Sequence, residues 1–311
     1  MNFAHLHLLL NHVPTVGAVV ALGLLILAYA RRNTHLQLAG LEVLVLIAIL
    51  TLPAYLTGVA AHLEQRDLPD FSESAVRTHH DAALAGFALT ELAGFVAWIA
   101  LWQSRRGRAA RGIVPAATVL LFLALALMGR AANLGGEIRH PEIRAAAYQD
   151  AGAADDPDRF LTTRISSYMV NSRWAWPAAE AVHFLAFALS FGVLLAVNLR
   201  ILGVMPQVPF ADVHRLLPWG MLGFGANLIT GMLFVVGQPG QYAANVPFYW
   251  KVAFLMVAGA NFLYLTVFTK GWAEEGLRAN LADKAMAVSS LFAWLGVLYA
   301  GRMLPFLGNA F

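Results

Sequence analysis

Eight long apolar runs constrain the fold of this chain more than any other feature. They cover approximately residues 3–30, 36–62, 74–103, 113–132, 176–203, 213–236, 247–270 and 281–300. A transmembrane helix needs about 20 mostly apolar residues, so each run is long enough to cross a bilayer. The chain is 59% hydrophobic and only 13% charged, whereas soluble domains carry about 25% charged residues. The sequence therefore predicts an all-α polytopic membrane protein with about eight transmembrane helices.

One long polar connection, residues 133–175, divides the eight runs into two groups of four. Connections of this length are uncommon inside compact domains and are usually functional or disordered. We therefore predict an N-terminal four-helix module over residues 1–132, a polar loop on the outer face over residues 133–175, and a C-terminal four-helix module over residues 176–311. Each module is expected to form a four-helix bundle. We find no convincing sequence repeat between the two halves.

The distribution of basic residues predicts the orientation in the membrane. Arginine and lysine are more frequent in the turns after the first, third, fifth and seventh runs, as in Arg31-Arg32 and Arg105-Arg106. Because cytoplasmic loops carry the excess of positive charge, those turns should be cytoplasmic. An even number of spans then places both termini on the outer face of a bacterial inner membrane. The net charge of +3 comes without a basic patch containing interleaved aromatic residues, so nucleic acid is not an expected partner.

Histidines gather at one depth in the predicted helices. Histidine is costly in hydrocarbon, so a cluster there indicates function. With a rise of 1.5 Å per residue, seven of the ten histidines fall near the side where the chain begins; these are His5, His7, His12, His62, His79, His80 and His183. Inward histidines from facing helices are a common way to hold a haem in a bundle.

The absence of cysteine narrows the metal chemistry. It excludes disulfides, thiolate catalysis, Cys-ligated iron–sulfur clusters and covalently attached haem. We expect one or two non-covalent haem b groups, because the histidine sites are apolar and poor in carboxylates. Zinc and copper also bind histidine, so spacing alone does not name the metal.

The favoured metal ligands are His12, His79 and His183, with His7, His62 and His80 as further cofactor-binding candidates. Matching depth favours a pairing of His12 with His79 or His80. His183 would take His62 or His7 as its partner or leave one axial position open.

Other polar residues have supporting roles in this interpretation. Basic residues near the same side could pair with haem propionates; these are Arg66, Arg77, Arg130, Arg173 and Lys251. Four side chains could accept a hydrogen bond from the second ring nitrogen of a ligand; these are Asn11, Glu64, Asp81 and Glu180. Three asparagines inside the spans are expected to join helices by hydrogen bonds; these are Asn198, Asn227 and Asn261.

Two segments resemble known sequence families. The segment Leu8-Leu9-Leu10-Asn11-His12-Val13-Pro14, together with Thr57-Gly58 and Thr78-His79-His80-Asp81, resembles uncharacterised bacterial four-helix membrane proteins that open with His-Leu-Leu-Leu-Asn-His-x-Pro. The likeness covers residues 1–103. It implies functional roles for His7, His12 and His79, while His80 stands where a Glu is usual.

The second likeness covers residues 174–268. It rests mainly on Glu180-Ala181-Val182-His183, His214-Arg215-Leu216-Leu217-Pro218-Trp219 and Gly237-Gln238-Pro239-Gly240-Gln241-Tyr242, which resemble another uncharacterised bacterial membrane family. Neither likeness brings an established activity. The architecture, two four-helix modules in one chain, is similar to that of membrane-anchored b-type cytochromes.

Three functions remain open from the sequence. The leading one is a membrane electron-transfer subunit, a bis-histidine b-type cytochrome that passes electrons between the quinone pool and an outer-face cytochrome or other redox subunit. The acidic residues Asp155, Asp156 and Asp158 of the long loop could steer a basic partner. The alternatives are a copper or zinc transport or handling protein and a non-redox membrane scaffold subunit.

Overall fold

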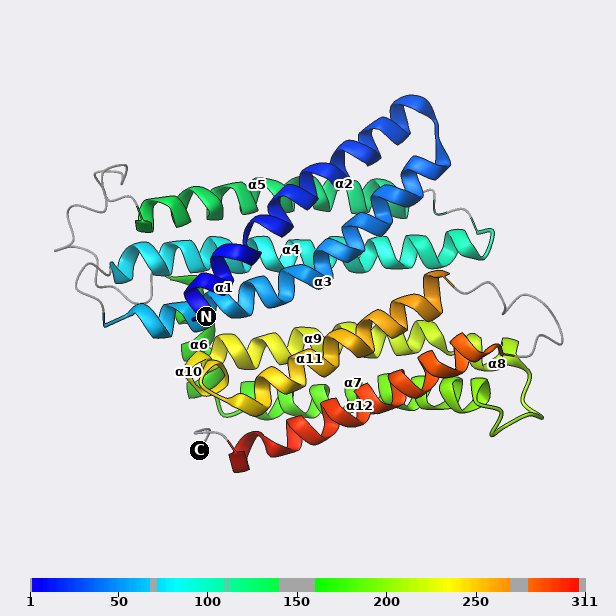
Figure 1. Ribbon diagram of the computed structural model, residues 1–311. Coiled ribbons are helices and arrows are strands. Elements are labelled where there is room, and N and C mark those ends of the chain that lie inside the picture. Colours follow the sequence, from blue (N-terminus) through cyan, green and yellow to red (C-terminus); the bar gives the residue numbers. More distant parts are fainter. Residues whose placement is uncertain are drawn as a thin grey trace. The chain divides into compact units, whose positions relative to one another are not determined.

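The computed structural model describes residues 2–67, 72–108, 110, 112–139, 160–268 and 279–307. All regular structure in these residues is helical (Figure 1). Eight helical segments are long and apolar enough to cross a membrane; these are Phe3–Arg31, Thr34–Gln65, Glu73–Arg105, Ile113–Ile138, Ala175–Ile201, Phe210–Gly237, Val246–Phe268 and Leu281–Leu307. The predicted all-α polytopic class is confirmed, and each predicted run coincides with one of these segments.

The chain forms two compact units, Met1–Ser167 and Tyr168–Phe311. The boundary falls inside the polar segment that separates the two groups of apolar runs. This segment also contains regular structure, since α5 continues to Arg139 and α6 covers Leu161–Asn171. The acidic residues Asp155, Asp156 and Asp158 lie outside the described residues.

Unit 1 is a bundle of four spans built from five helices. Helix α2 packs on α3, α3 packs on α4, α4 packs on α5, and α2 also touches α5. Small residues allow the close approach, as at Gly94 of α4, where an added Cβ would lie 2.3 Å from the Cβ of Ala48 in α3. The helices are α1 (Phe3–Leu10), α2 (His12–Arg31), α3 (Thr34–Gln65), α4 (Glu73–Arg105) and α5 (Ile113–Arg139).

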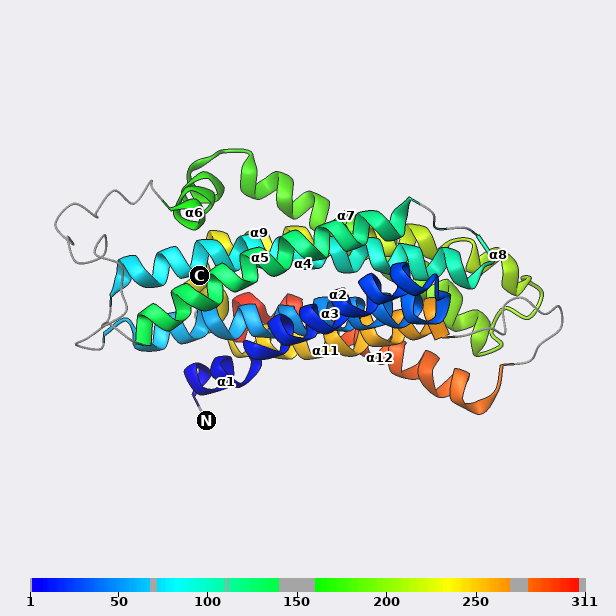
Figure 2. The same cartoon turned by 90° about the horizontal axis from the view of Figure 1, so that it is seen from above.

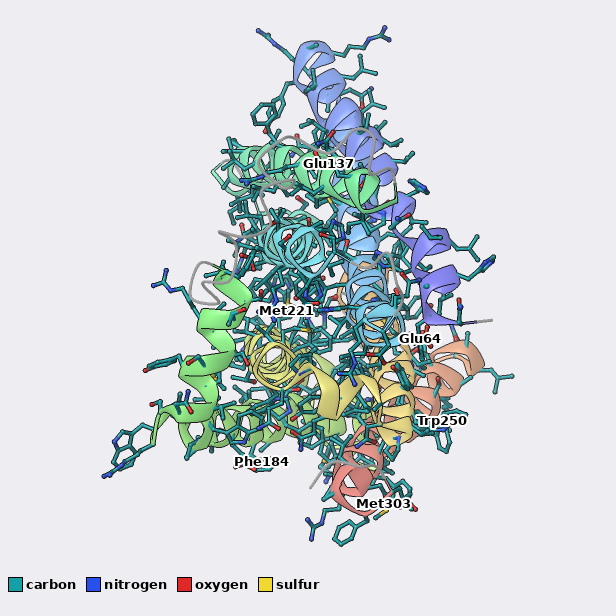
Figure 3. The ribbon with its side chains drawn as sticks, turned by 90° about the vertical axis from the view of Figure 1, so that its left-hand side faces the viewer. Glu64, Glu137, Phe184, Met221, Trp250 and Met303 are labelled. Carbon is teal, nitrogen blue, oxygen red and sulfur yellow. The ribbon has the colours of Figure 1, made fainter. Side chains whose placement is uncertain are left out.

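The first span is interrupted at Asn11, which separates α1 from α2 (Figure 2). Pro14 lies in the first turn of α2, where a proline costs no intrahelical hydrogen bond. The apolar run after Pro14 is long enough to form the rest of the span as α2. The Glu64 carboxylate near the end of α3 accepts hydrogen bonds from the amides of Phe3 (2.9 Å) and Ala4 (3.4 Å). It thereby ties the N-terminus of α1 to α3, and Figure 3 labels Glu64 at this place.

Unit 2 contains four further spans. Its helices are α7 (Ala175–Ile201), α8 (Phe210–His214), α9 (Leu217–Gly237), α10 (Pro239–Ala243), α11 (Val246–Leu263), the π-helical turn η4 (Tyr264–Phe268) and α12 (Leu281–Leu307). Helix α7 packs on α9 and on α12, and α11 packs on α12. The predicted role of the three asparagines is confirmed. Asn198 donates to Ser290 Oγ, Asn261 donates to Ser289 Oγ, and Asn227 donates to the His183 carbonyl.

Large apolar side chains cover much of the outer surface of both units. Phe184 and Trp250, labelled in Figure 3, are 63% and 61% exposed. Large exposed apolar surfaces are rare on soluble monomers, and hydrocarbon is the environment in which they are stable. Contact with membrane lipid follows from the eight apolar spans and this surface.

Candidate functional site

His7 of α1 and His79 of α4 lie side by side inside unit 1. Their ring centroids are 6.5 Å apart and their ring planes meet at 75°. Both side chains are half-buried. The two residues are far apart in the sequence, so the bundle assembles this pair.

Hydrogen bonds fix the proton on the same ring nitrogen in both histidines. His7 Nδ1 is 2.9 Å from the carbonyl oxygen of Ala54 in α3, and His79 Nδ1 is 2.8 Å from that of Ala131 in α5. A carbonyl oxygen can only accept, so each Nδ1 must carry the proton and donate it. Each Nε2 then has a lone pair that is available to a metal.

A glycine gives each ring access to the carbonyl that it uses. Gly58 follows Ala54 by four residues and Gly135 follows Ala131 by four residues, and in a helix the side chain at this spacing lies over the preceding turn. A Cβ added to Gly58 would lie 2.9 Å from His7 Cε1, and one added to Gly135 would lie 3.2 Å from His79 Cε1. The imidazoles therefore occupy space that any other residue would fill.

A second pair of histidines lies beside the first. The His80 ring stacks on Tyr55 of α3 with centroids 5.9 Å apart, and it meets the edge of His62 at 5.7 Å. His80 Nε2 is buried and has no hydrogen-bond partner. The partner of His62 Nε2 is the Glu73 carboxylate at 3.2 Å. The four predicted histidines of α1, α3 and α4 are thus gathered in one region.

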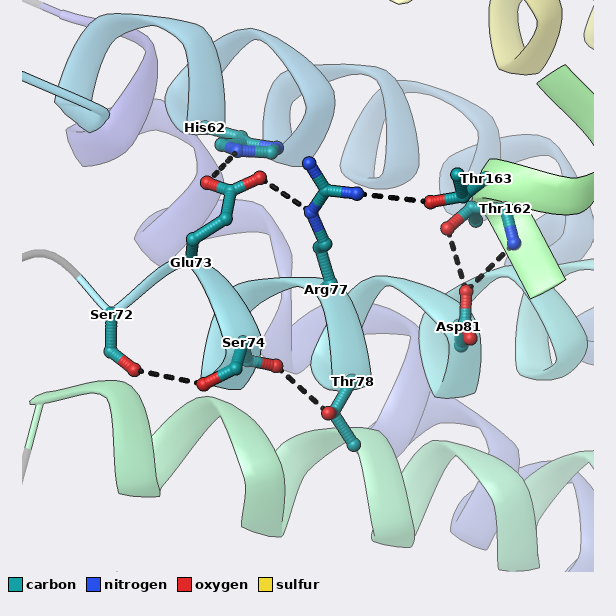
Figure 4. Close-up of polar contacts among 9 residues, drawn as sticks. All are labelled: His62, Ser72, Glu73, Ser74, Arg77, Thr78, Asp81, Thr162 and Thr163. Atoms are coloured by element: carbon teal, nitrogen blue, oxygen red, sulfur yellow. Dashed lines mark hydrogen bonds and ion pairs between the residues drawn. The ribbon is translucent and has the colours of Figure 1, made fainter. Parts of the chain in front are cut away.

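Polar contacts at the start of α4 hold this region together (Figure 4). Glu73 bridges His62 and Arg77, and Arg77 also donates to Thr163 Oγ1 at 3.1 Å. Asp81 accepts from the amides of Leu161 and Thr162, which caps the first turn of α6. The carboxylates of Glu64 and Asp81 therefore cap helices. The sequence had assigned these carboxylates the role of accepting a hydrogen bond from a histidine ring, and backbone carbonyls take that role instead.

His12, a favoured ligand from the sequence, lies elsewhere. It is the first residue of α2 and is exposed. Five residues are about 1.4 helical turns, so His12 would not share a face with His7 even in an unbroken helix. The pair that the structure forms with His79 contains His7, and the predicted pairing of His12 with His79 is replaced by it.

Three of the basic residues proposed for propionates, all arginines, differ in their availability. Arg77 is engaged by Glu73 and Thr163. Arg66 has 61% of its side chain exposed and lies 3.8 Å from Asp67 Oδ1. Arg173, which belongs to unit 2, is exposed.

His183 occupies a similar environment in unit 2. Its Nδ1 lies 2.8 Å from Thr230 Oγ1 of α9. Thr230 Oγ1 also lies 2.8 Å from the Ala226 carbonyl, to which it can donate. Phe234 meets the edge of the His183 ring at 5.5 Å.

Sequence reasoning gave Gly135, Tyr55 and Thr230 no part in these sites, and Thr57-Gly58 entered only through the first family likeness. Gly58 and Gly231 each follow a threonine directly, and a Thr-Gly pair inside an apolar run was a signal that could have identified them. Glycine is helix-destabilising by roughly 0.5–1 kcal/mol relative to Ala, so its placement in a span calls for a packing reason. Tyr55 carries no comparable signal.

The fold and the site define a multi-pass, all-α membrane protein with paired histidines at the end of a four-helix bundle. No protein-family model, curated protein or solved structure matches this chain. Among the described residues, no three His, Cys, Asp or Glu side chains are arranged to hold a bare metal ion. The donor set of the central pair is two imidazole nitrogens.

Proposed function

We propose that unit 1 binds a haem b between His7 and His79, and that the protein is a membrane electron-transfer subunit. The observation that carries this proposal is the shared hydrogen bonding of the two rings. Each Nδ1–H is donated to a backbone carbonyl of a neighbouring helix. Metal-bound histidines almost always donate their other N–H in this way, which orients the ring and raises its basicity.

The separation of the rings also supports the pair as axial ligands. Metal–imidazole bonds of about 2 Å on opposite sides of one metal put the two ring centres roughly 6 Å apart. The centroids of His7 and His79 are 6.5 Å apart. The glycines at 58 and 135 leave the space that these rings need.

The number of donors favours haem over a bare ion. Zinc takes four ligands in structural sites and at least three from the protein in catalytic sites. Haem supplies four nitrogens itself and takes one or two axial ligands from the protein. Two histidines on a haem leave no open coordination position, which suits electron transfer and not oxygen chemistry.

The proposed route runs between the quinone pool and a redox partner on the outer face of a bacterial inner membrane. The histidine pair lies near the starts of the first and third spans, so a haem there would be shallow. The positive-inside rule puts this end of the bundle outside. A shallow haem is within reach of an outer cytochrome or other redox subunit. Among the basic residues considered for the propionates, Arg66 lies in unit 1 with 61% of its side chain exposed, and its contact with Asp67 is long at 3.8 Å.

The test is a visible spectrum of the purified protein and of three variants. We expect a Soret band and sharp α and β bands on reduction. His7→Ala and His79→Ala should each remove the haem of unit 1, because one axial ligand and its hydrogen bond are lost. His12→Ala should leave the spectrum unchanged, since His12 is exposed.

Two results would contradict the proposal. A colourless protein that copurifies with copper or zinc would favour the metal-handling alternative. Retention of the full haem content in both His7→Ala and His79→Ala would contradict the proposed pair, and haem loss in His12→Ala would then favour the pairing of His12 with His80 that the sequence also allowed.

A further inference from the structure

The seam between helices α3 and α4 has a regular register that decides which of their residues face each other. Three contacts define it; these are Gly94 with Ala48, at 2.3 Å from an added Cβ to the Ala48 Cβ, Phe87 with Tyr55, with ring centroids 4.9 Å apart, and His80 with His62, with ring centroids 5.7 Å apart. Successive contacts are seven residues apart on both helices, which is close to two helical turns, so the register is constant along the seam. Glu91 precedes Gly94 by three residues and Thr51 follows Ala48 by three, so Glu91 and Thr51 occupy facing positions.

Glu91 is a carboxyl group without a partner near the middle of α4. Its Oε1 is buried and has no hydrogen-bond partner among the described residues. Helices α3 and α5 pack along α4. Residues 82–104 of α4, 43–61 of α3 and 113–129 of α5 contain no other charged side chain, and Tyr55 is the one further titratable group in these ranges. An ionised carboxylate without a partner is strongly disfavoured in apolar surroundings, so Glu91 holds a proton.

Polar side chains enter the seam from the histidine end of the bundle. The Glu73 carboxylate, at the exposed start of α4, lies 3.2 Å from His62 Nε2 (Figure 4). The edge of the His62 ring meets His80, and His80 stacks on Tyr55 with centroids 5.9 Å apart. His80 Nε2 is buried without a hydrogen-bond partner, which leaves it open to a proton or a water molecule. Side chains from α4, α3, α4 and α3 in turn thus make a continuous set of contacts from the surface into the seam.

The deeper part of the seam leads from Tyr55 to Glu91. Tyr55 is one helical turn from Thr51 on α3, and Thr51 occupies the position that faces Glu91. Glu91 lies about 16 Å beyond His80 along α4, at 1.5 Å per residue. The Thr51 hydroxyl donates to the Ile47 carbonyl at 2.7 Å, so its oxygen retains lone pairs that can accept a hydrogen bond.

We propose that Glu91 is a proton-binding site in the middle of the membrane, and that protons reach it along the α3–α4 seam from the histidine end of the bundle. The path consists of four side chains and of water between the last of them and Glu91; these are Glu73, His62, His80 and Tyr55. An imidazole accepts a proton on one ring nitrogen and releases the proton of the other, so both histidines begin and end neutral. Each passage replaces the proton of the Glu91 carboxyl by one from solvent, without a change in oxidation state. This inference does not depend on the haem.

The first test is infrared spectroscopy of the full-length protein in lipid nanodiscs. A protonated carboxyl group has a C=O stretching band that is separate from those of amides and carboxylates. We expect such a band in the wild type and its loss in Glu91→Gln, which keeps the size of the side chain. Glu42→Gln should retain the band, because Glu42 pairs with Arg105. Transfer to heavy water should shift the band as deuterium replaces the proton.

The rate of that shift tests the path. Tyr55→Phe removes one hydroxyl and keeps the stacked ring, and His80→Phe removes both ring nitrogens. Each variant should slow the exchange at Glu91 by roughly a hundredfold, the lower end of what a positioned proton-transferring side chain contributes. Tyr29→Phe, at an exposed position of α2, is the matched control and should exchange at the rate of the wild type.

The outcomes separate this inference from the proposed haem. A missing band, or a band that persists in Glu91→Gln, would overturn the proton site. A Glu91 band that does not shift in heavy water, or that shifts at the rate of the wild type in both Tyr55→Phe and His80→Phe, would overturn the path. A colourless protein with the expected band and exchange would keep this inference and remove the haem. Haem in a protein without the Glu91 band would do the reverse.

Discussion

At the scale of the residue, a carbonyl and a glycine one turn later form the same local arrangement twice in unit 1. The Ala54 carbonyl accepts a hydrogen bond from His7 Nδ1, and the His7 ring lies against Gly58. The Ala131 carbonyl accepts one from His79 Nδ1, and the His79 ring lies against Gly135. A side chain one turn after the carbonyl would cover it, so the glycine is what allows an imidazole to reach it. The ring nitrogen that keeps the lone pair in each histidine is therefore set by residues on another helix.

Neighbouring glycines of α5 provide a matched test of this arrangement. Gly135→Ala places a methyl group 3.2 Å from His79 Cε1, whereas a Cβ at Gly136 meets nothing within 4 Å. We expect Gly135→Ala to lower haem occupancy or shift the reduced α band, because the ring must move from its hydrogen bond with Ala131. Gly136→Ala should keep the spectrum and stabilise the helix by up to about 1 kcal/mol. Identical spectra and haem contents for the two variants would contradict the role of Gly135.

At the scale of the element, α1 is a helix of eight residues that is held by its neighbour α3. A helix this short is not stable alone in water. The Glu64 carboxylate accepts from its first amides, and negative charge is favourable at this end of a helix. His7 depends on α1 for its position, so the site depends on this contact.

Glu64→Ala is expected to weaken α1 by about 1 kcal/mol, the usual cost of losing a helix N-cap. Amide hydrogen exchange over residues 3–10 should become faster, and the haem of unit 1 should dissociate more readily. Glu64→Gln retains an acceptor oxygen and should have a smaller effect. Glu42→Ala, which removes a contact with Arg105 at the other end of α3, serves as the control and should leave exchange in α1 unchanged. Equal exchange in Glu64→Ala and the wild type would show that α1 does not need this cap.

The helices were readable from the sequence to different degrees. Each span could be placed from the sequence. In lipid, a helix is the stable structure for a single apolar segment that is long enough to cross the bilayer. The helix α6 could not be placed, since it contains only 11 residues and its first turn is capped by Asp81 from α4. Capping by a residue 80 positions away in the chain has no local signal.

At the scale of the whole molecule, depth was predictable and direction around the helix was not. The rise per residue placed His7, His12 and His79 near one level of the membrane. It could not say whether His7 or His12 faces the bundle, because these two histidines lie in one nearly uniform apolar run. The choice of His7 is made by α1 packing on α3, which is a property of the assembled unit.

The orientation of the chain is the last prediction, and the cysteine-free sequence makes it directly testable. We expect Asp67→Cys and Trp174→Cys to react with a membrane-impermeant maleimide in intact spheroplasts, because both exposed positions follow or precede spans on the predicted outer side. His35→Cys and Val204→Cys lie on the basic side and should react only after permeabilisation. The wild type supplies a background without labelling. The reverse pattern would place the histidine pair of unit 1 toward the cytoplasm, and an outer-face redox partner would then be excluded.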